Sequence, residues 1–163
     1  MCIFDQLRTG LTTASAEETR ALAARLAAVL SPDATLALHG DLGVGKTTFV
    51  QGLAEGFGLT AQVTSPTFNI LHLYRGPSAA RPASEQDVLS QNRRAGEFTL
   101  VHLDAYRLGN AHQVAELMLD DFLVSPYCLA VEWPDRIAAW LPPDTLHLTL
   151  GIAAPGRHRI RLS

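Results

Sequence analysis

Apolar residues recur along this chain with two different periods, one typical of helices and the other of strands. Leu22, Leu26 and Leu30 lie on one side of a helix predicted over residues 16–30. Ser15 precedes that helix, and its side-chain oxygen can accept a hydrogen bond from the free N–H groups of the first turn. We therefore expect this part of the chain to supply an amphipathic helix that covers other elements.

Short apolar runs that stop at glycine, proline or an acidic residue predict buried strands. The predicted strands are an edge strand at about 7–12 and the segments 35–39, 68–74, 98–103 and 127–131. The predicted helices cover 46–57, 114–119 and a single turn at 137–141. Residues 145–150 and 157–162 alternate in polarity, which predicts a terminal hairpin. Strands that alternate with helices indicate an α/β fold, and the hairpin makes its sheet mixed.

Residues 76–97 interrupt this regular pattern. They contain Pro77, Pro82, several serine and alanine residues and the pair Arg93-Arg94, with no helical or strand period. Long irregular segments inside a domain are typical of insertions, so we expect a mobile insertion here. The whole chain, residues 1–163, is short enough to form one domain.

The composition excludes some classes of protein. Of the 163 residues 47% are apolar, and 13 Lys+Arg stand against 16 Asp+Glu for a net charge of −3. This balance argues against a protein that holds nucleic acid by charge alone. Because no membrane-length apolar segment or signal peptide is evident, we expect a cytoplasmic location. Cys2 and Cys128 are expected as reduced thiols. The six histidines show no metal-ligand spacing and are expected to be structural or surface residues.

A glycine-rich turn joins the predicted strand 35–39 to the predicted helix 46–57. Its sequence fits G-x-x-x-x-G-K-[ST], the P-loop, in which backbone N–H groups surround phosphate and the lysine reaches the outer phosphates. The threonine hydroxyl is a ligand for Mg²⁺. The predicted ATP-binding residues here are Gly40, Asp41, Leu42, Gly43, Val44, Gly45, Lys46, Thr47 and Thr48. The fold class is therefore a P-loop NTPase-like mixed sheet with flanking helices, and the alternative is a chance glycine turn.

Acidic residues follow two of the predicted buried strands. Asp104 ends one and Glu132 ends the other. Because ligands of α/β sheets bind at the carboxyl ends of strands, both acids are expected beside the P-loop. We predict Lys46, Asp104 and Glu132 as catalytic residues and Thr47, Glu132 and Asp104 as Mg²⁺ ligands. The sequence leaves open which acid contacts the metal directly.

Each of these features has a simpler alternative. An acid at a strand end can cap a helix or pair with Arg107 or Arg136. Ser65 and Thr67 flank a proline after the P-loop helix, where hydroxyls serve either as a switch that senses phosphate or as a polar turn. Trp133, beside Glu132, is either a core aromatic residue or a residue close to the nucleotide. Gly52 and Gly56 lie inside the predicted helix 46–57 and indicate close packing.

Four blocks occur in the order GDLGVGKTT, SPTF, HLDAYRL and VEWPDRI. Together they resemble the bacterial TsaE (YjeE) family, the ATPase components of tRNA threonylcarbamoyladenosine synthesis, over about residues 15–161. The resemblance implies a P-loop fold with a mixed sheet and weak intrinsic ATPase activity. It also implies work with the proteins TsaB and TsaD, which transfer the threonylcarbamoyl group to tRNA. The tRNA would then be an indirect partner, and no membrane would be involved.

The resemblance also implies roles for single residues. Lys46 and Thr47 would hold phosphate and Mg²⁺, Glu132 would join Thr47 at the metal, and Asp104 would take the Walker-B-like place. Trp133 matches the family's tryptophan, which follows the acid represented here by Glu132.

The predicted terminal hairpin is the last segment with a possible role. A Gly-Arg turn there, which in the family lies near the nucleotide, points to Gly156 and Arg157. Arg157, Arg159 and Arg161 share one face of the second strand. That face is either a solvated edge strand or a contact with ATP, a partner or tRNA.

Two other functions remain open at this level. A P-loop kinase for a small acceptor would carry an arginine-rich lid, for which Arg93 and Arg94 are the only lid-like residues. A non-catalytic switch would bind a partner in its ATP state without hydrolysis.

Overall fold

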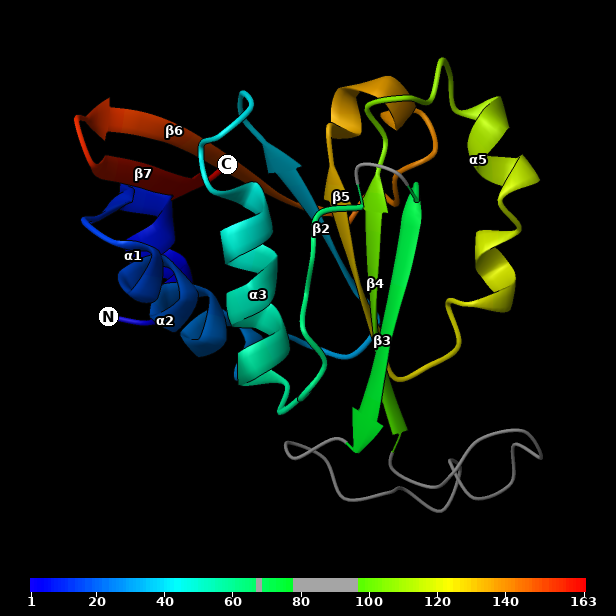
Figure 1. The fold of residues 1–163 in the computed structure, drawn as a ribbon, viewed down its shortest axis with the longest axis horizontal. Coiled ribbons are helices and arrows are strands. Elements are labelled where there is room, and N and C mark those ends of the chain that lie inside the picture. The colour runs from blue at the N-terminus through cyan, green and yellow to red at the C-terminus, as the bar shows by residue number, and fades with distance from the viewer. Residues whose placement is uncertain (67–68, 78–96) are drawn as a thin grey trace.

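The computed structural model describes residues 1–66, 69–77 and 97–163. Their strands form one mixed seven-stranded sheet in the order β1-β7-β6-β2-β5-β4-β3 (Figure 1). The strands are β1 Leu11–Thr13, β2 Ala34–His39, β3 Leu71–Pro77, β4 Glu97–Asp104, β5 Tyr127–Glu132, β6 Leu146–Ala154 and β7 Arg157–Leu162. The predicted α/β class with a mixed sheet and a terminal hairpin is therefore confirmed.

The central strands run parallel, which fixes where the site forms. β2 lies between β5 and β6, and β4 lies on the other side of β5, all in parallel pairs. The register pairs Glu132 with Leu38 on one side and with Asp104 on the other. The carboxyl ends of β2, β5 and β4 are therefore level with one another, at the edge of the sheet where the glycine-rich loop begins.

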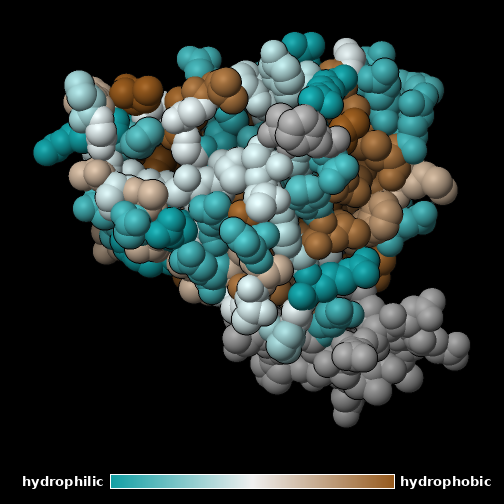
Figure 2. Space-filling model, in the orientation of Figure 1, coloured by the Kyte–Doolittle hydropathy of each residue, from teal (hydrophilic) through white to brown (hydrophobic). Residues whose placement is uncertain are grey.

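Helices cover the two faces of the sheet. One set comprises α1 Ile3–Thr9, α2 Ala16–Ala27 and α3 Lys46–Gly56, and the other comprises α5 His112–Glu116 with the short 3₁₀ helices η1 Leu119–Asp121 and η2 Pro134–Ile137 (Figure 1). Successive residues of β4 pack into different apolar layers, since Leu100 belongs to the layer of the first set and Val101 to that of the second. Partly buried apolar residues gather between β3 and α5 (Figure 2). Within the described residues, no helix combines the length and the apolar character that crossing a membrane requires.

The predicted helix signals act as expected at α2 and α3. Ser15 Oγ accepts a hydrogen bond from the Glu18 N–H at 3.1 Å, and Glu18 in turn accepts one from the Ala14 N–H at 2.7 Å. The chain leaves α3 through Gly58, whose φ of 72° lies in the left-handed region that glycine adopts without strain.

The amino terminus differs from the prediction of an edge strand at about 7–12. Residues 3–9 form the helix α1, because Ile3 and Leu7 lie one turn apart and bury the same face. The Cys2 sulfur accepts a hydrogen bond from the Asp5 N–H and caps this helix. The edge strand is only Leu11–Thr13, the part that pairs with β7.

Other boundaries also differ from the predictions. Helix α2 ends at Ala27, the helical turn near 137–141 is the earlier η2, and β7 is an inner strand between β1 and β6 rather than an edge. Gly76, Pro77 and Glu97 belong to strands β3 and β4, which pair with each other up to Pro77 and Glu97. The rest of the predicted insertion, with Arg93 and Arg94, lies outside the described residues, as does Phe68.

Two glycines let α3 lie close to α2. A Cβ atom on Gly52 would be 2.3 Å from the Arg20 carbonyl oxygen, and one on Gly56 would be 2.6 Å from the Ala24 carbonyl oxygen. Real Cβ atoms do not approach backbone so closely. The helix that begins at the P-loop is thus held against α2 at a distance that only glycine allows.

Replacing Gly52 with alanine should destabilise the protein, although alanine is the better helix former by about 1 kcal/mol. Overpacking costs about 1–3 kcal/mol in general, and here the obstacle is backbone. We expect a net loss of roughly 1–2 kcal/mol in the free energy of unfolding, measured by urea denaturation. Gly151→Ala is the matched control, since a Cβ there meets nothing within 4 Å. Equal stability of the two variants would contradict this account of the α2–α3 contact.

Candidate nucleotide-binding site

The loop between β2 and α3 has the backbone of an anion cradle. Gly40, Gly43 and Gly45 all have positive φ, at 137°, 80° and 100°. A Cβ on Gly40 would lie 2.3 Å from the Leu150 carbonyl oxygen, so the turn out of β2 also requires glycine for space. Gly43 and Gly45 have open space beside them, so their requirement is conformational alone.

Lys46, the first residue of α3, extends back over this loop. Its ammonium donates to the carbonyl oxygens of Gly40 at 2.6 Å and Asp41 at 2.8 Å, and it lies 4.2 Å from the centre of the Trp133 ring. Only 5% of the residue is exposed. Burial lowers the pKa of Lys46, and negative charges on Glu132, Asp104 and Asp41 oppose that shift. The loop therefore holds a buried cation among carboxylates.

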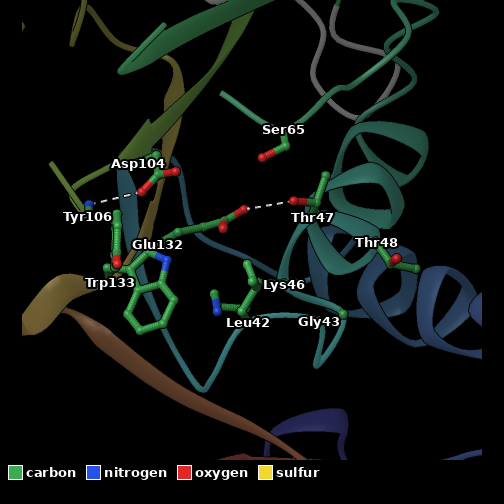
Figure 3. Close-up of a pocket in the computed structure, with 11 residues that line it drawn as sticks. Leu42, Gly43, Lys46, Thr47, Thr48, Ser65, Asp104, Tyr106, Glu132 and Trp133 are labelled. Atoms are coloured by element: carbon green, nitrogen blue, oxygen red, sulfur yellow. Dashed lines mark hydrogen bonds between the residues drawn. The ribbon is translucent and has the colours of Figure 1, made fainter. Parts of the chain in front are cut away.

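Glu132, at the end of β5, accepts two hydrogen bonds on the same oxygen. The Thr47 hydroxyl donates to Oε1 at 3.1 Å, and His102 Nε2 lies 2.8 Å from the same atom. His102 is fully buried and Glu132 is 5% exposed. The P-loop threonine, β4 and β5 are thus connected through one carboxylate. Figure 3 shows its contact with Thr47.

Asp104, at the end of β4, faces the same space. Its Oδ1 accepts a hydrogen bond from the Tyr106 N–H at 2.9 Å. Burial raises the pKa of Asp104, the nearby Glu132 charge raises it further, and the Tyr106 hydrogen bond opposes the shift. Neither Arg107 nor Arg136 forms an ion pair with Asp104 or Glu132 within the described part of the chain.

These groups line a pocket of about 510 Å³, which is within the usual size range of small-molecule sites. Its lining residues are Leu42, Gly43, Gly45, Lys46, Thr47, Thr48, Ser65, Asp104, Tyr106, Glu132 and Trp133. Figure 3 shows the Glu132 side chain directed toward Thr47 on α3, with Asp104 and Trp133 on the opposite side of the pocket. Residues that the sequence placed far apart therefore converge on one cavity.

Some predicted residues lie beside the pocket rather than in its wall. Gly40, Asp41 and Val44 belong to the loop but do not line the cavity, and neither do Gly156 and Arg157. The hairpin instead contacts the loop through the ring of His158, which bonds the Val44 carbonyl oxygen at 2.9 Å. Thr67 lies outside the described residues.

Trp133 lies at the pocket because the chain turns sharply after Glu132. Its φ of 56° is unusual for a bulky residue and directs the chain into η2. The indole covers Lys46, and its ring centre lies 5.1 Å from that of Tyr106. Of the two interpretations offered by the sequence, the structure favours a residue of the site over a core aromatic.

Known proteins resemble this chain over most of its length. The profile of the family described as Threonylcarbamoyl adenosine biosynthesis protein TsaE matches residues 13–159. The chain belongs to the TsaE family. The tRNA threonylcarbamoyladenosine biosynthesis protein TsaE of Bacillus subtilis is 34% identical over 148 residues, which cover 91% of this chain and 80% of that protein. That of Streptomyces coelicolor is 36% identical over 132 residues, with coverages of 80% and 77%.

A solved structure extends this likeness to the fold. The crystal structure of YdiB from Bacillus subtilis has a TM-score of 0.68 and 30% sequence identity to this chain. The match covers 94% of this TsaE-family chain and 82% of YdiB. The fold described above is therefore shared with a solved structure.

Two residues of the site were not found by reasoning from the sequence. Tyr106 lines the pocket and His102 bonds Glu132, yet the histidines were expected to be structural or surface residues. Both belong to the block HLDAYRL on which the TsaE resemblance was based. That block was therefore the available signal, although only its aspartate was assigned a role.

Asp104→Asn should stabilise this TsaE-family chain at neutral pH, measured without metal or nucleotide. A raised pKa means that the folded state binds the proton more tightly than the unfolded state, so stability falls as pH rises from the ordinary value of 3.8 through the folded value. Asparagine removes that loss and keeps an oxygen for the Tyr106 N–H.

We expect a higher melting temperature for Asp104→Asn than for the parent protein near pH 7. The difference should shrink as the pH falls through the raised folded-state pKa of Asp104 toward the ordinary value of 3.8, because the carboxyl then takes up its proton. The exposed Asp121 provides the control, since Asp121→Asn should leave the melting temperature nearly unchanged at both pH values. A lower melting temperature of Asp104→Asn at pH 7 would show that Asp104 stabilises the fold.

Proposed function

We propose that this protein binds and hydrolyses ATP with Mg²⁺, as a component of the machinery that makes threonylcarbamoyladenosine in tRNA. The observation that carries the proposal is the hydrogen bond between Thr47 and Glu132. It joins the P-loop hydroxyl to a strand-end carboxylate inside a pocket of about 510 Å³. This combination supplies phosphate-binding backbone, a buried cation and oxygen ligands in one place.

The loop and the first turn of α3 would hold the phosphates. The proposed ATP-binding residues are Gly40, Asp41, Leu42, Gly43, Val44, Gly45, Lys46, Thr47 and Thr48, together with Gly156 and Arg157 of the hairpin. The N–H groups at the start of α3 have no partner inside the helix and favour an anion. Lys46 has to exchange its bonds with the Gly40 and Asp41 carbonyl oxygens for bonds with phosphate. That exchange is favourable because a phosphate carries full negative charge.

The donor set beside the loop fits Mg²⁺, which prefers oxygen ligands and usually binds through one or two carboxylates. The Thr47 hydroxyl and the Glu132 and Asp104 carboxylates would hold it, directly or through water. Bound Mg²⁺ would neutralise charge on the outer phosphates. Burial and, to a smaller extent, the Glu132 charge raise the pKa of Asp104, and a divalent cation would offset both effects by stabilising the two carboxylates.

Other residues would tune the reaction. Asp104 and Glu132 are the groups able to orient a water molecule for attack on the terminal phosphate, which yields ADP and phosphate. Ser65 lines the pocket and, with Thr67, is proposed to sense the phosphate as a switch segment. Trp133 would cover Lys46 and limit access of bulk water to the site.

The family assignment suggests the biological setting. The relatives are tRNA threonylcarbamoyladenosine biosynthesis proteins, and we propose that this chain works with TsaD and TsaB in the cytoplasm. TsaD with TsaB would transfer the threonylcarbamoyl group, while ATP hydrolysis by this chain would support turnover of that complex. tRNA would be contacted only through the complex.

Two substitutions should separate nucleotide binding from hydrolysis. Lys46→Ala should abolish ATP binding, because it removes the cation that faces the phosphates. Glu132→Ala should reduce turnover by orders of magnitude and keep measurable ATP affinity, because the loop remains intact. Binding is measured with a fluorescent ATP analogue and turnover by phosphate release. Glu116→Ala, on the exposed side of α5, is the control, and normal turnover by Glu132→Ala would refute its role.

Adding TsaD and TsaB should raise ATP turnover above the weak level of the chain alone. Modified adenosine in tRNA should then accumulate over several cycles, and Lys46→Ala should prevent this. Radiolabelled γ-phosphate distinguishes the alternatives: label on a small acceptor indicates a kinase, and tight binding without release indicates a non-catalytic switch. If the partners change neither turnover nor tRNA modification, the proposed setting is wrong.

A further inference from the structure

His102 is a buried polar residue with one clear contact. It lies in β4, is fully buried, and its Nε2 atom is 2.8 Å from Glu132 Oε1. Its side chain lies on the face of β4 that also carries Leu100, within the apolar layer under α3. Among the described residues, its Nδ1 atom has no hydrogen-bond partner.

An imidazole in this position needs a physical reason. A buried nitrogen without a partner costs free energy, and an apolar side chain would fill the same volume without that cost. The hydrogen bond to the carboxylate is the only polar contact of the ring within the described chain that offsets the cost. A neutral ring carries one proton, and an acceptor beside Nε2 favours the tautomer with the proton on that atom.

The Glu132 carboxylate needs this donor for its orientation. Oε1 receives Nε2–H from the core side and the Thr47 hydroxyl from the loop side. Without His102, Thr47 would be the one remaining side-chain donor to the carboxylate among the described residues, although its hydroxyl is also the proposed metal ligand. Residues behind metal ligands commonly change affinity or activity by about 10–100-fold when they are removed.

We propose that His102 is a positioning residue, which donates its Nε2 proton to Glu132 and fixes that carboxylate toward Thr47. The inference rests on the proposed function only in treating Glu132 as a residue of the Mg²⁺–nucleotide site. His102 itself touches neither phosphate nor metal. β4 thereby contributes twice to the site, through His102 behind Glu132 and through Asp104 beside it.

The test compares two substitutions of His102 in the full-length protein. His102→Leu keeps an apolar filling but removes the donor, whereas the amide nitrogen of His102→Gln can reach the same oxygen. We expect His102→Leu to lower kcat for ATP about 10–100-fold with little change in the KM for ATP. His102→Gln should recover most of that loss.

His147→Leu is the matched control, because His147 is a partly buried histidine that bonds another histidine, His39, at 2.9 Å rather than a pocket residue. It should retain normal kcat. Normal kcat for His102→Leu would overturn the proposal. So would an equal loss in folded His102→Gln, since a preserved donor would then make no difference.

Two further measurements do not depend on turnover. Titration of Mg²⁺ into the ADP-bound protein should give an affinity about 10–100-fold weaker for His102→Leu and near normal for His102→Gln. Nitrogen NMR of histidine-labelled protein should show one ring with a protonated Nε2 and a bare Nδ1, whose signals move in Glu132→Ala. A bare Nε2 on His102 would contradict the inference, because the ring could then donate no proton to Glu132.

These readouts keep the two proposals apart. If the parent protein never hydrolyses ATP, even with TsaD and TsaB, the proposed function fails. The NMR signature and the Mg²⁺ affinities would still decide whether His102 positions Glu132.

Discussion

The carboxylate of Glu132 is held from two sides, and the arrangement of the site depends on that constraint. The Thr47 hydroxyl approaches it from the first turn of α3, and His102 approaches it from within β4. Thr47 and Glu132 are 85 residues apart in the chain, so their contact exists only because β2 and β5 are parallel neighbours. The register that sets Leu38 beside Glu132 also brings the P-loop level with the acid.

Close packing behind the loop serves the same geometry. Gly52 and Gly56 place α3 against the backbone of α2, and Gly40 passes close to the Leu150 carbonyl oxygen. The position of Thr47 relative to Glu132 is therefore set by contacts on several sides. A shift of either element would lengthen the hydrogen bond between these two side chains.

Charged side chains are concentrated at the pocket, although burying them reduces the stability of the folded protein. Lys46 is buried although burial lowers its pKa, and Asp104 lies half-buried near Glu132 although burial and then that neighbouring charge raise its pKa. Charged groups in such surroundings lose their favourable interaction with water, and protein dipoles replace only part of that interaction. Functional sites commonly retain arrangements of this kind because binding of charged ligands requires them.

The sequence by itself determined the local elements and the chemistry of the loop. Fixed glycine spacing, a capping box and apolar periodicity act over a few residues, so they predicted the P-loop, α2, α3 and the terminal hairpin, and four blocks indicated the family. Asp104 and Glu132 were found because strand ends in α/β sheets share one edge. The helix α1 was missed because it has only two buried positions.

Only the tertiary structure decided which side chains meet. No spacing in the sequence indicates that His102 bonds Glu132, because that contact depends on the parallel register of β4 and β5. The place of Trp133 over Lys46 depends on a positive φ that its residue type does not favour. Gly156 and Arg157 stayed outside the pocket wall because the hairpin contacts the loop through His158 instead. Such contacts join distant segments, and their energies depend on the whole sheet rather than on any local pattern.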